Sequence, residues 1–322
     1  MMRDFDDIRL LLLREPRGYP AQNVNFLFES DVAEHGFVIG EHGGVYPGMS
    51  GHNCMCVATA LVETGVVPAE GGSARFTLEA PAGLVDVHAL LDDGGKVRKV
   101  SLELGTAYVE RLDLNVRLPP PAGVESVVVD LVYGSGMTYA VVEASDLIKL
   151  EPERGREIVR LGEMIKCKTR EVADWTHPIT GEPGPEILVF RGPSTEEQQE
   201  DGTTVVVASN TVVMSNGGAC DWARPESFTG MLDRSPCGTG TCAVMAALHA
   251  RGTLRVNDRL LHTSIVGTTF EGTVLSESNV LEDRRGIKPR LSGRAWITAH
   301  ATVVLDASDP FQTGLPEVRD IW

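Results

Sequence analysis

The chain contains two copies of one sequence pattern, 187 residues apart, and this repeat limits the folds open to it more than any other feature. The first copy, Tyr46 to Gly65, reads YPGMSGHNCMCVATALVETG, and the second, Ser235 to Gly252, reads SPCGTGTCAVMAALHARG. Each copy has a loop, a glycine-containing elbow, a short apolar helix, and a glycine where helices commonly end. One duplication predicts two similar domains rather than a solenoid of many repeats.

Three segments have the apolar spacing of helices: Cys54 to Thr64, Pro152 to Thr169, and Thr241 to Arg251. The first and third belong to the repeat and are apolar on all sides, which predicts that other elements enclose them. Short segments rich in β-branched residues predict strands at 36–41, 74–80, 84–91, 96–104, 126–134, 137–144, 186–192, 203–209, 260–267 and 294–305. Many strands with few helices favour an α+β fold.

The sequence therefore predicts two similar domains, each a barrel-like sheet of strands around a central apolar helix, with the active site in the cleft between them. We place the N-terminal domain at residues 1–155 plus 302–322 and the C-terminal domain at residues 156–301. The predicted helix at 152–169 is the natural connector between the two.

The charge balance argues against several classes of partner. The 322 residues include 29 Lys and Arg against 45 Asp and Glu, a net charge of −16, which repels a phosphate backbone and disfavours nucleic acid. No run of about 18 apolar residues predicts a membrane span. The start, MMRDFDDIRLLLLREPRG, has acidic flanks and no small-residue cleavage site, unlike a signal peptide. We therefore expect a cytoplasmic protein.

The six cysteines are few for a disulfide scaffold, and they do not form a CxxC pair. They are Cys54, Cys56, Cys167, Cys220, Cys237 and Cys242. On a helix, Cys54 and Cys56 point to different faces. We expect reduced cysteines that are mostly small core residues, and no metal site. Cys237 is the exception.

The elbows of the two copies carry the chemistry, since Ser50 of the first falls on Cys237 of the second. Backbone N–H groups at the start of a helix lack intrahelical partners, and the helix dipole favours negative charge there. Two such helix starts facing one cleft predict a small carboxylate as the guest. The same position predicts a lowered pKa for the Cys237 thiol. A thiolate there could act as a general base on the carbon next to the carboxylate.

Two motifs resemble the proline racemase family, whose usual patterns are M-C-G-H-N/G and D-R-S-P-C/T-G-T/S-G-T. The matching stretches here are MSGHN at 49–53 and DRSPCGTGT from Asp233 to Thr241. LLREPRG, ALVETG, DLVYG, SIVGTTFEG and GIKPRLSGRAWIT also resemble family members, so the resemblance spans most of the chain. It implies the duplicated fold that this family shares with diaminopimelate epimerase, and a reaction that uses no cofactor.

The resemblance also assigns roles to residues. Two opposed acid–base groups, here Ser50 and Cys237, exchange the α-proton of proline or a hydroxyproline. The amides of Gly51, His52 and Asn53 on one side, and of Gly238, Thr239, Gly240 and Thr241 on the other, bind the substrate carboxylate. His52 and Asp233 lie near the substrate nitrogen or ring hydroxyl. Family members are often dimers, so the resemblance allows a homodimer.

The chain departs from the family pattern at its beginning. Family members usually carry an N-terminal strand with an H-T-x-G-E-P-x-R stretch before the EPRG region, and this sequence does not contain it. On this basis the first domain is expected to lack one sheet strand, through a late start site or a truncation.

The second departure is Ser50, which stands where racemases have cysteine. A serine hydroxyl is a poor base, but as a neutral alcohol it can donate a proton to a carbanion. One interpretation is a 4-hydroxyproline 2-epimerase with Ser50 as the weaker acid–base group. Another is dehydration of trans-3-hydroxy-L-proline, which needs one base; family dehydratases, however, usually keep the first cysteine and replace the second with threonine. We favour a hydroxyproline epimerase, with dehydration as a second activity that this pattern allows.

Other interpretations remain. A proline racemase with two thiols is disfavoured by Ser50. A non-catalytic binder of proline-like acids is favoured by Ser50 and by the missing segment, and disfavoured by the intact DRSPCGTGT. Diaminopimelate epimerase is disfavoured because its E-R-G-x-G-E-T run is missing. Phe26, Phe28 and Trp222 are candidates to face the substrate ring, and equally candidates for the core or surface.

Overall fold

The computed structural model describes residues 2–215, 220–281 and 284–316. Its α-helices are α1 (Met2–Leu13), α2 (Gly51–Glu63), α3 (Gly155–Ala173) and α4 (Gly238–Ala250), with short 3₁₀ helices η1 (Pro120–Ala122), η2 (Pro152–Arg154) and η3 (Pro225–Ser227). Its strands are β1 (Val24–Phe28), β2 (His35–Gly40), β3 (Ser73–Ala80), β4 (Gly83–Leu91), β5 (Val97–Glu103), β6 (Ala107–Arg117), β7 (Ser126–Gly134), β8 (Thr138–Glu143), β9 (Ile187–Gln198), β10 (Thr204–Ser215), β11 (Gly230–Leu232), β12 (Arg259–Thr263), β13 (Thr269–Leu281) and β14 (Arg284–Gly293). The α+β class predicted from the sequence is confirmed.

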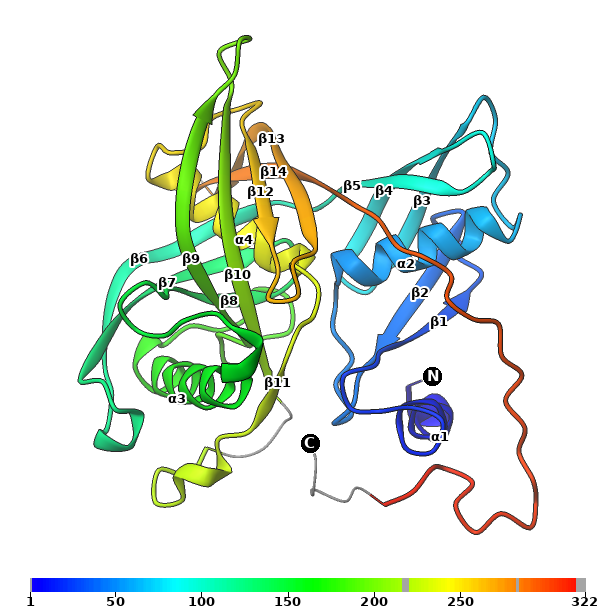
Figure 1. The fold of residues 1–322 in the computed structure, drawn as a ribbon, viewed down its shortest axis with the longest axis horizontal. Helices are drawn as coiled ribbons and strands as arrows, with labels where there is room; N and C mark the ends of the chain where they lie inside the picture. Colours follow the sequence, from blue (N-terminus) through cyan, green and yellow to red (C-terminus); the bar gives the residue numbers. More distant parts are fainter. Residues whose placement is uncertain (1, 216–219, 282–283, 317–322) are drawn as a thin grey trace.

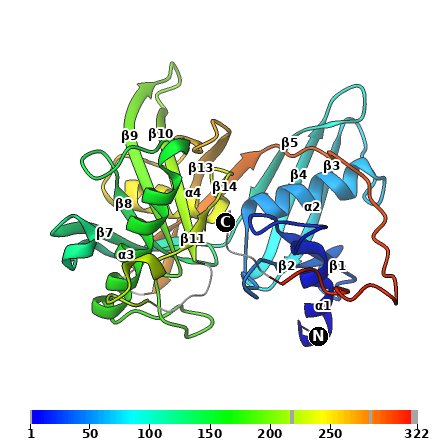
Figure 2. The same ribbon diagram turned by 60° about the horizontal axis from the view of Figure 1, so that its bottom comes forward.

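The strands of the described residues form one continuous sheet in the order β1-β2-β3-β4-β5-β14-β13-β12-β10-β9-β8-β7-β6, with β11 on β10. Strand β14 closes part of this sheet on itself: Arg290–Gly293 pair with the neighbouring β5, while Gly286 and Ile287 pair with β6, the last strand of the order. The sheet thus wraps around α4 on one side and covers α2 on the other, giving the two lobes of Figures 1 and 2.

The three predicted helices are present. The repeat helices α2 and α4 begin three residues earlier than predicted, because their first turns are the glycine-rich elbows. Every residue of α4 from Gly238 to Leu248 is buried, as its all-round apolar sequence predicts. Helix α2 buries Cys54 and exposes Cys56, so the two cysteines do face opposite ways.

One predicted strand is wrong. Residues 294–305 leave the sheet after β14 and run without strand pairing along the lobe that holds α2 (Figure 1). Trp296 and Leu305 are each 61% exposed. The segment has the composition of a strand, but a strand needs a hydrogen-bonded neighbour, and no other described strand lies against it. The chain then returns to α1, where the Leu315 amide donates to the Glu15 carbonyl at 2.8 Å.

The grouping of elements bears on where the lobes divide. Strands β3–β5 lie with α2, whereas β6–β8 pair onward to β9 and pack with α4 (Figure 1). Helix α3 packs against β9, β10 and β11 rather than bridging the lobes. The chain crosses between lobes from β5 to β6 and again after β14. The division at residues 155/156 stays a prediction.

A disulfide joins Cys167 of α3 to Cys220, with their Cα atoms 6.3 Å apart, so the expectation of six reduced cysteines is wrong for this pair. The two lie 53 residues apart in sequence, and only the packing of α3 beside β10 brings them together. Cys54, Cys56, Cys237 and Cys242 are free. Among the described helices, none is long and apolar enough to cross a membrane.

The two lobes meet where the first residues of α2 and α4 are in contact. A Cβ on Gly238 would lie 2.5 Å from the Cα of Gly51, and a Cβ on Gly51 would lie 2.9 Å from the Cα of Gly238. Both contacts are with backbone, which has no rotamer to change. Only glycine at both positions therefore permits the helix starts to approach this closely.

This contact predicts a stability effect. Gly238→Ala is expected to lower the free energy of unfolding by roughly 1–3 kcal/mol or more, because the new methyl overpacks a backbone contact. The measurement is urea-induced unfolding. Gly105→Ala is the matched control, because a Cβ there meets no atom within 4 Å. Equal stability of the two variants would contradict the close approach of the helix starts.

Candidate active site

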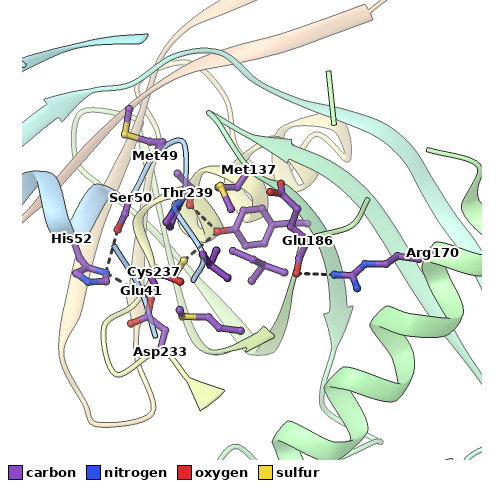
Figure 3. A pocket seen from close by; sticks show the side chains of 15 residues that line it. Glu41, Met49, Ser50, His52, Met137, Arg170, Glu186, Asp233, Cys237 and Thr239 are labelled. Carbon is purple, nitrogen blue, oxygen red and sulfur yellow. Dashed lines mark hydrogen bonds and ion pairs between the residues drawn. The ribbon is translucent and has the colours of Figure 1, made fainter. Parts of the chain in front are cut away.

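A cavity of about 270 Å³ opens in front of the two touching helix starts (Figure 3). It is lined by Glu41, Val45, Pro47, Met49, Ser50, His52, Met137, Tyr139, Arg170, Glu186, Ile187, Met214, Asp233, Cys237 and Thr239. Of the residues predicted from the sequence, Ser50, His52, Asp233, Cys237 and Thr239 reach this cavity. Phe26, Phe28 and Trp222 are not among its lining residues.

Ser50 is the N-cap of α2. Its backbone is extended (φ −151°, ψ 117°), and its hydroxyl oxygen accepts from the Asn53 side-chain amide at 2.9 Å and from the Asn53 backbone N–H at 3.4 Å. The Asn53 side-chain oxygen in turn accepts from Asn25 at 2.9 Å. The hydroxyl proton of Ser50 remains available for His52 Nδ1, 3.5 Å away, or for a ligand. Ser50 thus combines ordinary capping with a position at the cavity.

Cys237 holds the corresponding place at α4 with different geometry. Its φ is +59° and its ψ 114°, a region that non-glycine residues seldom adopt. Two neighbours hold this conformation, because the Cys237 N–H donates to the Ser235 hydroxyl at 3.1 Å and the Thr241 hydroxyl donates to the Cys237 carbonyl at 2.7 Å. Such strained residues persist where the surroundings fix them, and they cluster at functional sites.

Tyr139 of β8 holds the sulfur of Cys237. Its hydroxyl lies 3.3 Å from Cys237 Sγ and 2.7 Å from the Thr239 hydroxyl (Figure 3). Gly240 leaves room for the sulfur beside the helix, since a Cβ there would be 3.0 Å from it. Tyr139 is fully buried inside an apolar strand sequence, so the sequence carried no signal for this role.

The Cys237 thiol is not poised as a thiolate in this structure. Burial raises its pKa to about 12, the negative charge of Asp233 adds to the rise, and hydrogen bonds from Tyr139, Gly240 and Thr239 oppose it. The expected lowering of this pKa is therefore corrected. The free-energy cost of removing the thiolate from water is larger than its stabilisation by the helix dipole, so the pKa rises.

His52 and Asp233 link the two lobes across the cavity. His52 Nδ1 lies 3.2 Å from the Ser235 hydroxyl and 3.8 Å from an Asp233 carboxylate oxygen. Asp233 is buried, and its other oxygen accepts from the Ser235 N–H at 2.8 Å. Residues from both copies of the repeat thus form one chain of polar contacts, which runs from Asp233 and Ser235 through His52 to Ser50.

The other residues predicted to bind the substrate carboxylate do not direct a side chain into the cavity. Thr241 is fully buried and bonds to the Cys237 carbonyl and to His262, away from the cavity. The Asn53 N–H is used by Ser50, and the Thr241 N–H by the Cys237 carbonyl. Within the described residues, no hydrogen bond is recorded for the amides of Gly51, His52, Gly238 and Thr239. These four could receive a carboxylate at the helix starts.

Three charged residues of the cavity were missed by the sequence reasoning. Glu186 accepts from the backbone and hydroxyl of Thr138 at 2.9 and 3.0 Å, and Arg170 donates to the Glu186 carbonyl at 3.2 Å (Figure 3). Glu41 lies at the end of β2, and burial, with the charge of Asp233, raises its pKa to about 7. Among the described residues there is no group of three or more His, Cys, Asp or Glu suited to a metal ion.

Solved structures of other proteins share this architecture. A hydroxyproline epimerase from Agrobacterium vitis, solved with bound trans-4-hydroxy-L-proline, is 30% identical over 98% of this chain and 84% of its own, with a TM-score of 0.80. A probable proline racemase from Agrobacterium radiobacter K84, solved with bound carbonate, is also 30% identical, over 98% and 85% of the two chains, with a TM-score of 0.79.

A further solved structure shares the fold only. A predicted epimerase from Pseudomonas aeruginosa is 12% identical over 94% of this chain and 88% of its own, with a TM-score of 0.53. At the level of sequence, the family model described as Proline racemase matches residues 1–316. With that match spanning nearly the whole sequence, the chain belongs to the proline racemase family.

Proposed function

We propose that this protein is a 4-hydroxyproline 2-epimerase that needs no cofactor. The observation that carries the proposal is the meeting of Ser50 and Cys237, at the starts of two facing helices, on one cavity with His52 and Asp233. The family supports an isomerase of this kind, and a relative of 30% identity binds trans-4-hydroxy-L-proline. A small cyclic amino acid also suits a cavity of about 270 Å³.

In the proposed reaction the substrate carboxylate lies against the unpaired amides of the two helix starts. Cys237, as thiolate, takes the α-proton, and the C–H electron pair moves into the carboxylate to give an enediolate. The amides stabilise the additional negative charge that develops on the carboxylate oxygens. The thiol must first lose its proton to solvent, and the positive ring nitrogen of the substrate offsets the neighbouring negative charge of Asp233 that opposes this loss.

The second half of the reaction falls to the Ser50 side of the cavity. A neutral hydroxyl donates its proton to the opposite face of the carbanion, and the resulting alkoxide must recover a proton from its surroundings. The His52–Asp233 chain provides a path for that recovery, since His52 Nδ1 lies 3.5 Å from the Ser50 hydroxyl. This half of the reaction is expected to limit the rate in both directions, because the Ser50 alkoxide that it forms, or starts from in reverse, is costly at neutral pH.

Dehydration of trans-3-hydroxy-L-proline is a second candidate, favoured by the single thiol in the cavity. Cys237 would take the α-proton while the Ser50 hydroxyl protonates the departing 3-hydroxyl, which leaves as water. The product is an enamine that tautomerises to pyrroline-2-carboxylate. Appearance of this product by NMR supports the dehydratase activity. If it does not appear while the 4-hydroxy substrate is epimerised, the dehydratase activity is ruled out and epimerisation is the activity supported.

Removal of the Cys237 thiol tests the proposed base. Cys237→Ala is expected to slow α-proton exchange of trans-4-hydroxy-L-proline in heavy water by roughly 10²–10⁴-fold, the usual contribution of a general base. Exchange is followed by NMR. Cys56→Ala, which removes an exposed free thiol, is the control and is expected to keep full activity. Most of the activity surviving in the Cys237 variant would rule out its role as the base.

Changes at Ser50 test the other face. Ser50→Cys is expected to raise the rate of inversion, because a thiol accepts and donates the proton nearer neutral pH than an alcohol. Ser50→Ala is expected to keep exchange but lose inversion, so that deuterium enters with retained configuration. Unchanged inversion in the alanine variant would show that the hydroxyl takes no part. Unfolding measurements control for the lost helix cap, worth about 1 kcal/mol.

The raised pKa of Cys237 predicts the pH dependence of alkylation. In a Cys56→Ala background, the reaction of Cys237 with iodoacetamide is expected to accelerate about tenfold per pH unit from pH 7 to 10, because the thiolate fraction grows by that factor below the pKa of about 12. Tyr139→Phe is expected to slow the alkylation of Cys237 at each pH, since the substitution removes a hydrogen-bond donor that stabilises the thiolate. A rate that levels off near pH 8 would contradict the buried neutral thiol.

A further inference from the structure

Glu41 is held firmly at the wall of the cavity. Its N–H donates to the Val45 carbonyl at 2.9 Å, and its own carbonyl accepts from the Arg9 guanidinium at 2.8 Å. The backbone is thus fixed from both sides, and the side chain lines the same cavity as Ser50 and His52 (Figure 3). Its position is set by β2 and α1, independently of the helix starts that carry Ser50 and Cys237.

The Glu41 carboxylate lacks a cationic partner within the described part of the chain. Its one recorded side-chain contact is with the Asn23 amide, at a long 3.5 Å. The other acidic groups of the cavity differ, because Glu186 accepts two hydrogen bonds from Thr138, and Asp233 accepts from Ser235 and lies near His52. A partly buried carboxyl group without such partners is costly to ionise, so its protonated form is favoured.

The charge of Asp233 adds to this cost, since the two carboxylates repel across the cavity. A cation placed before them would relieve the repulsion and let both ionise. The helix starts, with their unpaired amides, provide for the anionic end of a ligand but not for a cationic one. The cavity therefore offers a positive charge a place between Glu41 and Asp233, the residue that the family resemblance also puts near the substrate nitrogen or ring hydroxyl.

We propose that Glu41 binds the positively charged ring nitrogen of the substrate. The inference rests on the proposed function, in which the substrate is a proline-type amino acid with one carboxylate and one ring ammonium. Glu41 then fixes the ring nitrogen while the helix amides fix the carboxylate, and the α-carbon lies between Ser50 and Cys237. Substrates whose ring carries no positive charge are discriminated against at this position.

The test is a binding cycle with three ligands and two proteins. Trans-4-hydroxy-L-proline, L-proline and tetrahydrofuran-2-carboxylate, which has a neutral ring oxygen in place of the ammonium, are titrated into wild type and Glu41→Gln by calorimetry at pH 8. The variant is expected to bind the two ammonium ligands about tenfold more weakly or worse, and tetrahydrofuran-2-carboxylate no more weakly than wild type does, because the variant also loses a negative charge that repels this anion. Glu125→Gln, which neutralises an exposed glutamate away from the cavity, is the control.

Each other outcome overturns the proposal. Equal weakening of all three ligands would make Glu41 a structural residue, and no weakening would remove it from binding. Weakening confined to trans-4-hydroxy-L-proline would assign Glu41 to the ring hydroxyl instead. The cycle is separate from the proposed reaction: wild type that binds L-proline but exchanges no α-proton refutes the epimerase while leaving the role of Glu41 measurable.

A second measurement uses wild type alone, so it does not depend on a variant that folds. Because Glu41 has a pKa of about 7 without ligand, binding of L-proline at pH 6.5 is expected to release protons, seen as a dependence of the binding enthalpy on the buffer. Tetrahydrofuran-2-carboxylate is expected to release fewer. Equal release by both ligands overturns the proposal. Arg9 contacts the Glu41 backbone, and the charged and titratable groups that share the cavity with Glu41 are His52, Tyr139, Arg170, Glu186, Asp233 and Cys237.

Discussion

The contact between Gly51 and Gly238 is the constraint on which the rest of the site depends. It brings two helix starts together, each with the positive end of its dipole facing the same space. Like poles at such a distance repel, and amides at both starts lack recorded partners within the described residues. An anion in front of them relieves both penalties at once. The carboxylate affinity that we propose would thus arise from the way the two lobes are joined, and not from a charged side chain.

The elbow residue differs between the two copies of the repeat, Ser50 in the first and Cys237 in the second. Ser50 keeps an extended backbone and caps its helix, which stabilises α2 at the mouth of the cavity. Cys237 caps nothing, has a positive φ, and is held there by Ser235 and Thr241. Ser50 therefore contributes to stability, whereas Cys237 adopts a strained backbone conformation in which its sulfur lies beside Tyr139. This difference explains how a serine can replace a cysteine at one helix start without loss of the fold.

The sequence predicted those parts of the molecule that local pattern controls. The repeat located α2 and α4. The apolar composition of α4 correctly predicted that the sheet encloses it, whereas α2 packs on β4, β5 and β14 and exposes Cys56. Pattern failed where the outcome depends on distant neighbours: residues 294–305 have strand composition but no strand beside them, and Cys167 meets Cys220 only through the packing of α3. Tyr139 reaches the cavity from β8, whose sequence looks like ordinary core, and Glu41 follows directly after β2. The pKa of Cys237 was misjudged because burial is a property of the whole fold.

The electrostatics of the cavity couple binding to chemistry. The thiol of Cys237 and the carboxyl of Glu41 are both held toward their neutral forms by burial, and the charge of Asp233 adds to both effects. A ligand that brings a positive ring nitrogen to this side removes the shared obstacle, so it favours the ionised carboxylate and the thiolate together. The base would then form chiefly when a substrate with the right charge is in place. With the proposed substrate, such a cavity would limit reaction of the thiol with other molecules and would select ligands by their charge before the ring substituents are distinguished.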